Sequence, residues 1–260
     1  MTETKYPTNL TDAQWQLIQP HLPPPRKRGR PPTDRRHILN AILYFVRAGC
    51  QWRLLPADFG PWQTVYHYYA TWRRDGHWTY LHDRLRARVR TAAGKDVRPT
   101  AAILDSQTVR SADHTGETGF DAAKKTKGRK RHLLVDTLGL LLAVCVTPAS
   151  TPERTGARQL LAGALQWLSW LRRLWVDGGY SGPEFAAWVR TQRRKLAVEV
   201  VSRLAGQRGF AVLPKRWIVE RTFGWLMKQR RLVRDYEVKA EHAEAWIYIA
   251  MIGIMVRRLA

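Results

Sequence analysis

Beyond residue 100 the chain alternates short apolar runs with segments of helical period, and this order restricts the possible folds more than any other feature. The apolar runs occupy residues 101–104, 132–135, 140–146, 174–176 and 198–201. The helical segments occupy residues 154–168, 183–193, 216–232 and 241–259. Asp136 and Gly139 bound a segment with type I turn chemistry, so the second and third runs should pair as a hairpin. The order therefore predicts an α/β fold, a mixed sheet with flanking helices.

The first part of the chain favours helices instead. Thr11 and Gln14 form the sequence pattern of a capping box, which predicts the start of a helix. Asp34 is placed to cap a second helix. Two further segments carry aromatic stripes at helical spacing, which we expect to face a core rather than to stack on bases. We predict a small all-α domain over residues 1–95 and the α/β domain over residues 96–260.

The charge balance points to a polyanionic partner. Lys and Arg total 44 against 21 Asp and Glu, a formal net charge of +23. A field of this size favours nucleic acid, bound either by an enzyme or by a basic coat protein. The longest apolar runs are shorter than a membrane span, and no secretory signal segment is expected. Two distant cysteines, Cys50 and Cys145, suggest neither a disulfide framework nor a zinc site, and a reducing cytoplasm fits best.

Three carboxylates stand where the predicted fold could bring them together. Asp105 ends the first apolar run and Asp177 ends the fourth. Ligand groups gather at strand ends in open α/β sheets, so both can face one crevice. Glu220 lies in the amphipathic segment RWIVERTFGWL, residues 216–226, beside its apolar stripe. We expect Glu220 to point along the edge of the sheet.

Each carboxylate also has a local alternative. Asp105 could cap a turn together with Ser106. Asp177 could be an ordinary turn residue before the two glycines that follow it. Glu220 could pair with the arginine four residues before it or with the one beside it. The joint pattern, rather than any single residue, favours a shared site.

A shared site of three carboxylates calls for cations, because the negative charges repel one another. Hard oxygen ligands that leave room for water and phosphate suit magnesium, with manganese as a substitute. Two ions held by Asp105, Asp177 and Glu220 can activate a nucleophile and stabilise the leaving oxygen of an in-line phosphodiester displacement. The predicted chemistry is divalent-metal-dependent and needs no Ser, Tyr or Cys nucleophile.

Several stretches carry a resemblance to a known family. They are ILDSQTVR (103–110), KGRKRHLLVDTLG (127–139), VDGGY (176–180), RWIVERTFGWLMKQRRLVRDYE (216–237) and, nearer the N-terminus, LTDAQWQLIQPHLPPPRKRGRPP and GCQWRLLP. Together they resemble the DDE transposases of bacterial insertion sequences, in the insertion-sequence-five type, over nearly the whole chain. The resemblance implies a ribonuclease H-like catalytic core with Asp105, Asp177 and Glu220 as the triad. It also implies cleavage and strand transfer of DNA ends.

The surroundings of the last carboxylate depart from related transposases, which often carry Tyr, Arg, Glu and Lys there. Arg216 and Glu220 match this signature. Leu213 stands at the Tyr position, and Lys228 lies one residue beyond the Lys spacing. The departures concern the accessory residues and not the triad.

Basic residues gather in three places and are predicted to contact DNA. One is a Pro-rich arm in the helical domain, which makes residues 1–95 the predicted DNA-binding domain. Another precedes the hairpin and is too charged to be buried, so phosphate contact is favoured over a solvated hairpin edge. The third surrounds Glu220. In chain order the residues are Arg26, Lys27, Arg28 and Arg30, then Lys124, Lys125, Lys127, Arg129, Lys130 and Arg131, then Arg216, Lys228, Arg230 and Arg231.

These patterns predict a transposase that acts on double-stranded DNA, both element ends and target. Two alternatives stay open: a metal-dependent nuclease or resolvase of the same fold, and a non-catalytic repressor derived from a transposase. The apolar final helix over 241–259 could be buried in its own core or shared with a second chain, and we favour the first. A homodimer is expected on paired DNA ends, in a bacterial cytoplasm at the nucleoid.

Overall fold

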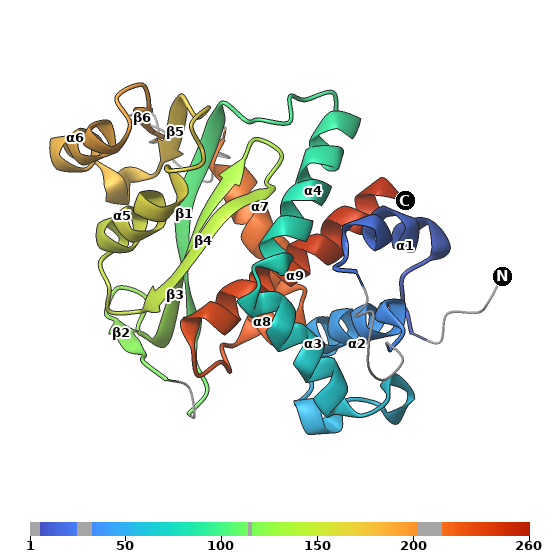
Figure 1. Ribbon diagram of the computed structural model, residues 1–260. Helices are drawn as coiled ribbons and strands as arrows, with labels where there is room; N and C mark the ends of the chain where they lie inside the picture. The colour runs from blue at the N-terminus through green and yellow to red at the C-terminus, as the bar shows by residue number, and fades with distance from the viewer. Residues whose placement is uncertain (1–5, 25–32, 114–115, 202–214) are drawn as a thin grey trace.

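The computed structural model describes residues 6–24, 33–113, 116–201 and 215–260. Its N-terminal part is helical, with α1 (Asp12–Ile18), α2 (Arg35–Ala48), α3 (Trp62–Arg74) and α4 (His77–Ala92), and short 3₁₀ turns η1 (Gln19–His21), η2 (Trp52–Leu54) and η3 (Ala57–Phe59) (Figure 1). The predicted helix starts are confirmed. Thr11 and Gln14 each accept a hydrogen bond from the other's backbone amide, and Asp34 accepts one from the Arg36 amide.

Among the described residues, six strands form one mixed sheet, as the order of apolar runs predicted. The strands are β1 (Ala101–Arg110), β2 (Gly119–Asp121), β3 (Thr126–Asp136), β4 (Leu141–Pro148), β5 (Arg173–Val176) and β6 (Ala197–Val200). Central β1 is antiparallel to β3 and parallel to β5, which is parallel to β6. On its other side β3 pairs with β4 and, near its start, with β2. The predicted hairpin turn is confirmed, since the Gly139 amide donates to the Asp136 carbonyl.

Helices cover both faces of this sheet (Figure 1). They are α5 (Glu153–Ala164), α6 (Pro183–Gln192), α7 (Arg216–Met227), α8 (Arg230–Val233) and α9 (Ala240–Leu259). Ala102 and Leu104 of β1 share a hydrophobic core with α5 and α6. Ile103, between them, belongs to a second core with α7, α9 and the N-terminal helices. Successive strand residues point to opposite faces, and here each face has its own helical layer.

The final helix, α9, is buried within its own chain, as we favoured from its sequence. It packs against α4, α2 and β4. Trp246 of α9 stacks on Tyr69 of α3, with ring centroids 4.1 Å apart, and His242 Nδ1 lies 2.9 Å from the Tyr69 hydroxyl. A buried ion pair between Arg90 of α4 and Asp136 at the hairpin turn also joins the helical N-terminal part to the sheet. The helical part and the sheet therefore share one hydrophobic core, and the proposed boundary after residue 95 falls between α4 and β1.

The first strand is longer than predicted, and Asp105 lies within it rather than at its end. Parallel pairing with β5 stops at Ile103, whereas antiparallel pairing with β3 continues to Arg110. Among the described strands, β3 is therefore the only one that pairs with β1 beyond Ile103, and near the end of β1 the Asp235 amide also donates to the Arg110 carbonyl. The apolar run of β1 ends near the point where pairing with β5 ends, and β1 itself continues with mostly polar residues.

The expectation that the basic segment before the hairpin is too charged to be buried is wrong for its second half. Arg129, Lys130 and Arg131 lie in β3 with exposed fractions of 2, 5 and 1%. We call these three the inner basic residues. Lys124 and Lys125, in the turn before β3, and Lys127, at its start, are exposed and are called the outer basic residues.

The inner basic residues are buried because the fold supplies acceptors for them. Arg129 donates to the carbonyl oxygens of Glu237 and Val238 and pairs with buried Asp235, whose oxygen lies 3.4 Å from Nη1. Arg131 donates to the Leu232 carbonyl at 2.7 Å. These acceptors belong to the segment between α8 and α9 and to α8 itself, so Arg129 and Arg131 fasten the C-terminal region to the sheet. Lys130 instead donates to the Thr151 carbonyl at 3.0 Å and lies 3.6 Å from Asp121. Phosphate contact is not proposed for the inner basic residues.

Candidate active site

The two candidate aspartates lie side by side because their strands are parallel neighbours in register. Ile103 pairs with Trp175, and Asp105 and Asp177 each follow two residues later. Asp105 Oδ1 accepts a hydrogen bond from the Ser106 amide at 2.7 Å. Asp177 caps the 3₁₀ turn η4 (Gly178–Tyr180), and its Oδ1 accepts from the Gly179 amide at 2.9 Å. Each aspartate thus makes its local turn or cap contact through Oδ1, and no described residue donates a hydrogen bond to its Oδ2.

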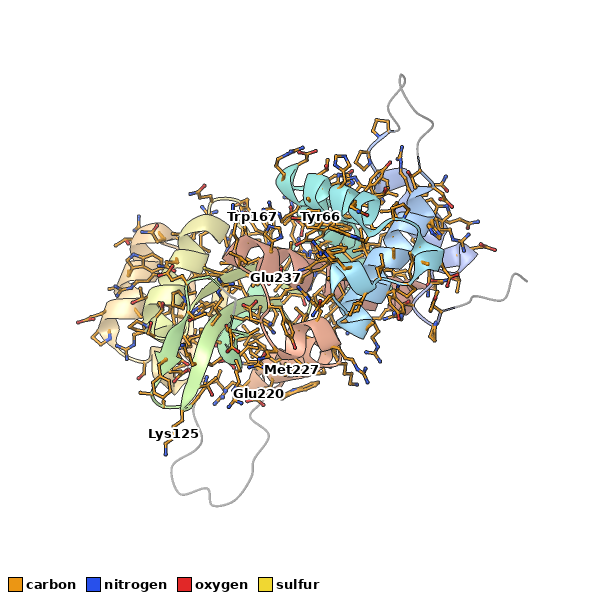
Figure 2. The ribbon with its side chains drawn as sticks, turned by 90° about the horizontal axis from the view of Figure 1, so that it is seen from below. Tyr66, Lys125, Trp167, Glu220, Met227 and Glu237 are labelled. Atoms are coloured by element: carbon orange, nitrogen blue, oxygen red, sulfur yellow. The ribbon has the colours of Figure 1, made fainter. Side chains whose placement is uncertain are left out.

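Glu220 does not join the two aspartates in this structure. It lies on α7, which packs along β1. Its Oε1 is 3.3 Å from Nη2 of Arg216, one helical turn earlier, and its side chain is 56% exposed. Figure 2 shows Glu220 at the outer surface of the molecule. The local alternative, an ion pair with Arg216, is therefore what the structure contains.

Glu153, which no sequence motif singled out, lies close to Asp177, on the face of the sheet to which the Ser106 side chain points. It is the first residue of α5, and its Oε1 accepts a hydrogen bond from Ser106 Oγ at 3.0 Å. Its Oε2 would lie 3.0 Å from a Cβ built on Gly179, and Asp177 Oδ1 would lie 3.1 Å from that same Cβ. Both carboxylates therefore face the space above Gly179. Only tertiary structure reveals this contact, because Glu153 approaches from a different element.

The electrostatics of Asp105 reflect this grouping. Burial raises the pKa of Asp105 to about 7, and the negative charges of Asp177 and Glu153 add to the rise. The Ser106 amide and the positive charge of Arg216 act in the opposite direction. Arg216 thus lies between two carboxylates: it pairs with Glu220 and also stabilises ionised Asp105.

The pair of aspartates suits a hard divalent cation, but a complete ligand set is not assembled. Among the residues that the structure describes, no three acidic, His or Cys side chains are arranged to hold a metal ion. The free oxygens of Asp105 and Asp177 are the type of donor that magnesium prefers. Glu220 could contribute only after its side chain leaves Arg216.

Comparison with known families shows to which family the chain belongs. Residues 97–256 match the family described as "Transposase DDE domain", which is more than half of the chain, and residues 10–82 match "Putative transposase of IS4/5 family". The chain belongs to the DDE transposases. Its sheet and flanking helices are accordingly a ribonuclease H-like fold, preceded by a helical N-terminal region. Family membership supports a transposase function, DNA as the partner and a divalent metal as the cofactor.

Two curated relatives resemble part of this DDE transposase. One is the "Insertion element IS402 uncharacterized 16.2 kDa protein" of Burkholderia cepacia, 36% identical over 109 residues, which are 39% of this chain and 73% of that protein. The other is "Uncharacterized protein y4sN" of Sinorhizobium fredii, 31% identical over 120 residues, which are 46% of this chain and 86% of that protein. The name of the first relative states that it belongs to an insertion element.

The basic residues of this DDE transposase divide into surface and internal groups. Lys124, Lys125 and Lys127 are exposed, and Lys125 points away from the body of the protein at the tip of its turn (Figure 2). Lys228 and Arg230 are also exposed. These five exposed residues form two groups, one around the start of β3 and one around the start of α8. The arm residues Arg26, Lys27, Arg28 and Arg30 lie outside the described residues.

Arg231 is held internally, contrary to the idea that it continues the Glu220 helix. The helix predicted over 216–232 is interrupted, because α7 ends at Met227 and Gln229 is extended before α8 begins. The Arg231 side chain is 10% exposed and pairs with Glu237.

No described helix has the length and hydropathy of a membrane span.

Proposed function

We propose that this DDE transposase cleaves the ends of an insertion sequence and transfers the strands to target DNA, with Asp105, Asp177 and Glu220 as its metal ligands. The observation that carries the proposal is the register of β1 and β5, which sets Asp105 beside Asp177 at one edge of the sheet. Two magnesium ions, or manganese in their place, would supply an activated nucleophile and charge stabilisation at the leaving oxygen.

Glu220 requires a side-chain movement in this proposal. Its carboxylate pairs with Arg216 across a single helical turn and is largely exposed, so only a rotation about its own side-chain bonds separates the pair. An exposed ion pair of this type contributes roughly 0–1 kcal/mol, which a cation can readily replace. Arg216 would then be free to contact a DNA phosphate, as the sequence predicts.

The exposed basic residues would bind the DNA backbone around the site. We propose that Lys124, Lys125 and Lys127 contact phosphates on one side of the aspartates, and Lys228 and Arg230 on the other side of α7. The N-terminal arm with Arg26, Lys27, Arg28 and Arg30 would add contacts within a DNA-binding region over residues 1–95. Because each chain carries one triad, two chains would act on paired ends, in the cytoplasm at the nucleoid.

The test is a cleavage and strand-transfer assay with DNA that carries the element's own ends. The variants Asp105→Asn, Asp177→Asn and Glu220→Gln should lose cleavage in magnesium and in manganese, while DNA binding is largely kept. Glu241→Gln is a matched control, since Glu241 pairs with Arg73 on α3 and takes no part in the contacts of the site. Cleavage in EDTA, or by any of the three variants, would contradict the proposal.

The same assay separates the alternatives. Cleavage without joining would identify a nuclease or resolvase, and DNA binding without cleavage would identify a repressor. Light scattering of the complex with paired ends would test the dimer, because one chain per active complex would exclude it.

A further inference from the structure

We propose that Glu153 is a fourth functional carboxylate of this site, a positioning residue whose charge strengthens the binding of divalent cations at Asp105 and Asp177. The proposal rests on the proposed function, since it assumes that the two aspartates bind metal. The proposal starts from a contrast between two glutamates: Glu220 pairs with Arg216, whereas Glu153 accepts a hydrogen bond from Ser106 and faces Asp177 across Gly179.

The first line of support is that Glu153 is fixed in place at the site. Ser106 is 7% exposed, and its hydroxyl donates to Glu153 Oε1 at 3.0 Å, while its backbone amide donates to Asp105 Oδ1 at 2.7 Å. A single residue of β1 therefore holds both carboxylates. Glu153 is thus linked to Asp105 through the residue that follows Asp105 in β1.

The second line of support is the orientation of the remaining oxygen. Glu153 Oε2 and Asp177 Oδ1 lie 3.0 and 3.1 Å from the position that a Gly179 side chain would fill. The two oxygens are therefore at most about 6 Å apart, with no side chain between them at that position. Two ionised carboxylates at this separation repel each other unless a positive charge compensates them.

Tyr180 borders the same space from the buried side. It is 1% exposed, and its hydroxyl lies near Ser106, the residue that contacts both carboxylates. Burial raises the pKa of Tyr180, and the charges of Asp105 and Glu153 contribute to the rise. The neutral phenol therefore adds no positive charge that could compensate the carboxylates.

Lys124 supplies the compensating charge in the metal-free protein. Its Nζ lies 3.7 Å from Glu153 Oε1, and its side chain is 45% exposed, so it can move away from the site without unfolding. Lys124 and a cation would therefore compete for the same negative charge. Removal of the Glu153 charge should therefore weaken cation binding, whereas removal of the Lys124 charge should strengthen it.

The experiment measures Mn²⁺ affinity by isothermal titration calorimetry on the full chain without DNA. Glu153→Gln keeps an acceptor for Ser106 but removes the charge, and it should weaken Mn²⁺ binding about tenfold or more, as is typical when a group outside the direct ligands is lost. Glu153→Asp should restore part of the affinity, because the charge returns. Lys124→Gln should strengthen binding, because the competing charge is gone.

Three further variants make the result interpretable. Glu241→Gln removes the same charge elsewhere and should leave Mn²⁺ affinity unchanged, and the thermal midpoint of each variant checks that the fold is retained. If Asp105→Asn and Asp177→Asn abolish binding but Glu153→Gln does not weaken it, the inference on Glu153 is overturned and the proposed function stands. If neither aspartate variant affects Mn²⁺ binding, the proposed metal site itself fails.

Discussion

The outer and inner basic residues are halves of one run in the sequence, yet the fold uses them in opposite ways. Lys124, Lys125 and Lys127 are exposed, whereas the inner three are buried against carbonyls and carboxylates. Gly128 separates the halves, and a Cβ there would lie 2.0 Å from the Val109 carbonyl, so β1 and β3 approach closely at that point. The comparison teaches that a cluster of positive charge need not be a nucleic-acid surface, because backbone carbonyls can serve as its partner.

The largest effect is expected from removal of an inner charge. Arg129→Met should lower the free energy of unfolding by roughly 3–5 kcal/mol, because it leaves Asp235 buried at 2% exposure without its partner. Urea unfolding followed by circular dichroism would measure the loss. Lys127→Met is the matched control on the same strand and should change stability by less than about 0.5 kcal/mol. Equal losses for both would show that the two halves do not differ.

A smaller effect, on DNA binding rather than on stability, is expected from the outer half. Replacement of Lys124, Lys125 and Lys127 by Gln should reduce the slope of log affinity against log salt by about 2.7, if each lysine contacts one phosphate. Fluorescence anisotropy with labelled duplex DNA at several salt concentrations would give the slope.

The control for this measurement removes three exposed charges at the end of α6 and just after it, outside the proposed DNA-binding residues, with Arg190, Arg194 and Lys195 replaced by Gln. If both triple variants change the slope equally, the outer residues contribute only to the general field and do not contact phosphate.

The smallest effect, a shift in the titration midpoint of His132 when Lys124 is replaced, concerns pH and connects the two halves. Burial, together with the positive charges of Lys130 and Lys124, lowers the pKa of His132 to about 4. The folded protein therefore binds fewer protons at His132 than the unfolded chain, whose histidine titrates at its ordinary value of 6.5. Stability from this residue is present above pH 6.5 and is lost as the pH falls toward 4.

NMR titration of the His132 ring protons would test this assignment. Lys124→Gln should raise the midpoint slightly, because one of the two lysine charges is removed. A midpoint near the ordinary histidine value in the unmodified protein would contradict the burial of β3 at this position.

Local chemistry made much of this fold predictable. The caps at Thr11 and Asp34 and the turn at Asp136 depend on neighbouring residues, and all three were confirmed. The adjacency of Asp105 and Asp177 was predictable because parallel strands fix the relation between their ends. The assignment of these aspartates and Glu220 as metal ligands stays a prediction.

Contacts between distant segments could not be predicted. The burial of Arg129 depends on Asp235 and on carbonyls more than a hundred residues away in the sequence. Glu153 reaches Ser106 across 47 residues, without any periodic pattern that relates the two. The outward orientation of Glu220 depends on a choice of partner, Arg216, that spacing alone leaves open.

The central position of α9 has a consequence for biosynthesis. The ribosome makes this 20-residue helix after every element that it joins. Between the end of α4 at Ala92 and the start of α9 at Ala240, roughly 150 residues must be added, which takes on the order of 10–30 s in a cell. Throughout that interval the apolar faces of α2, α3 and α4 lack the partner that buries Tyr69. Until α9 emerges, we expect the nascent N-terminal helices to expose apolar surface of the kind that chaperones bind.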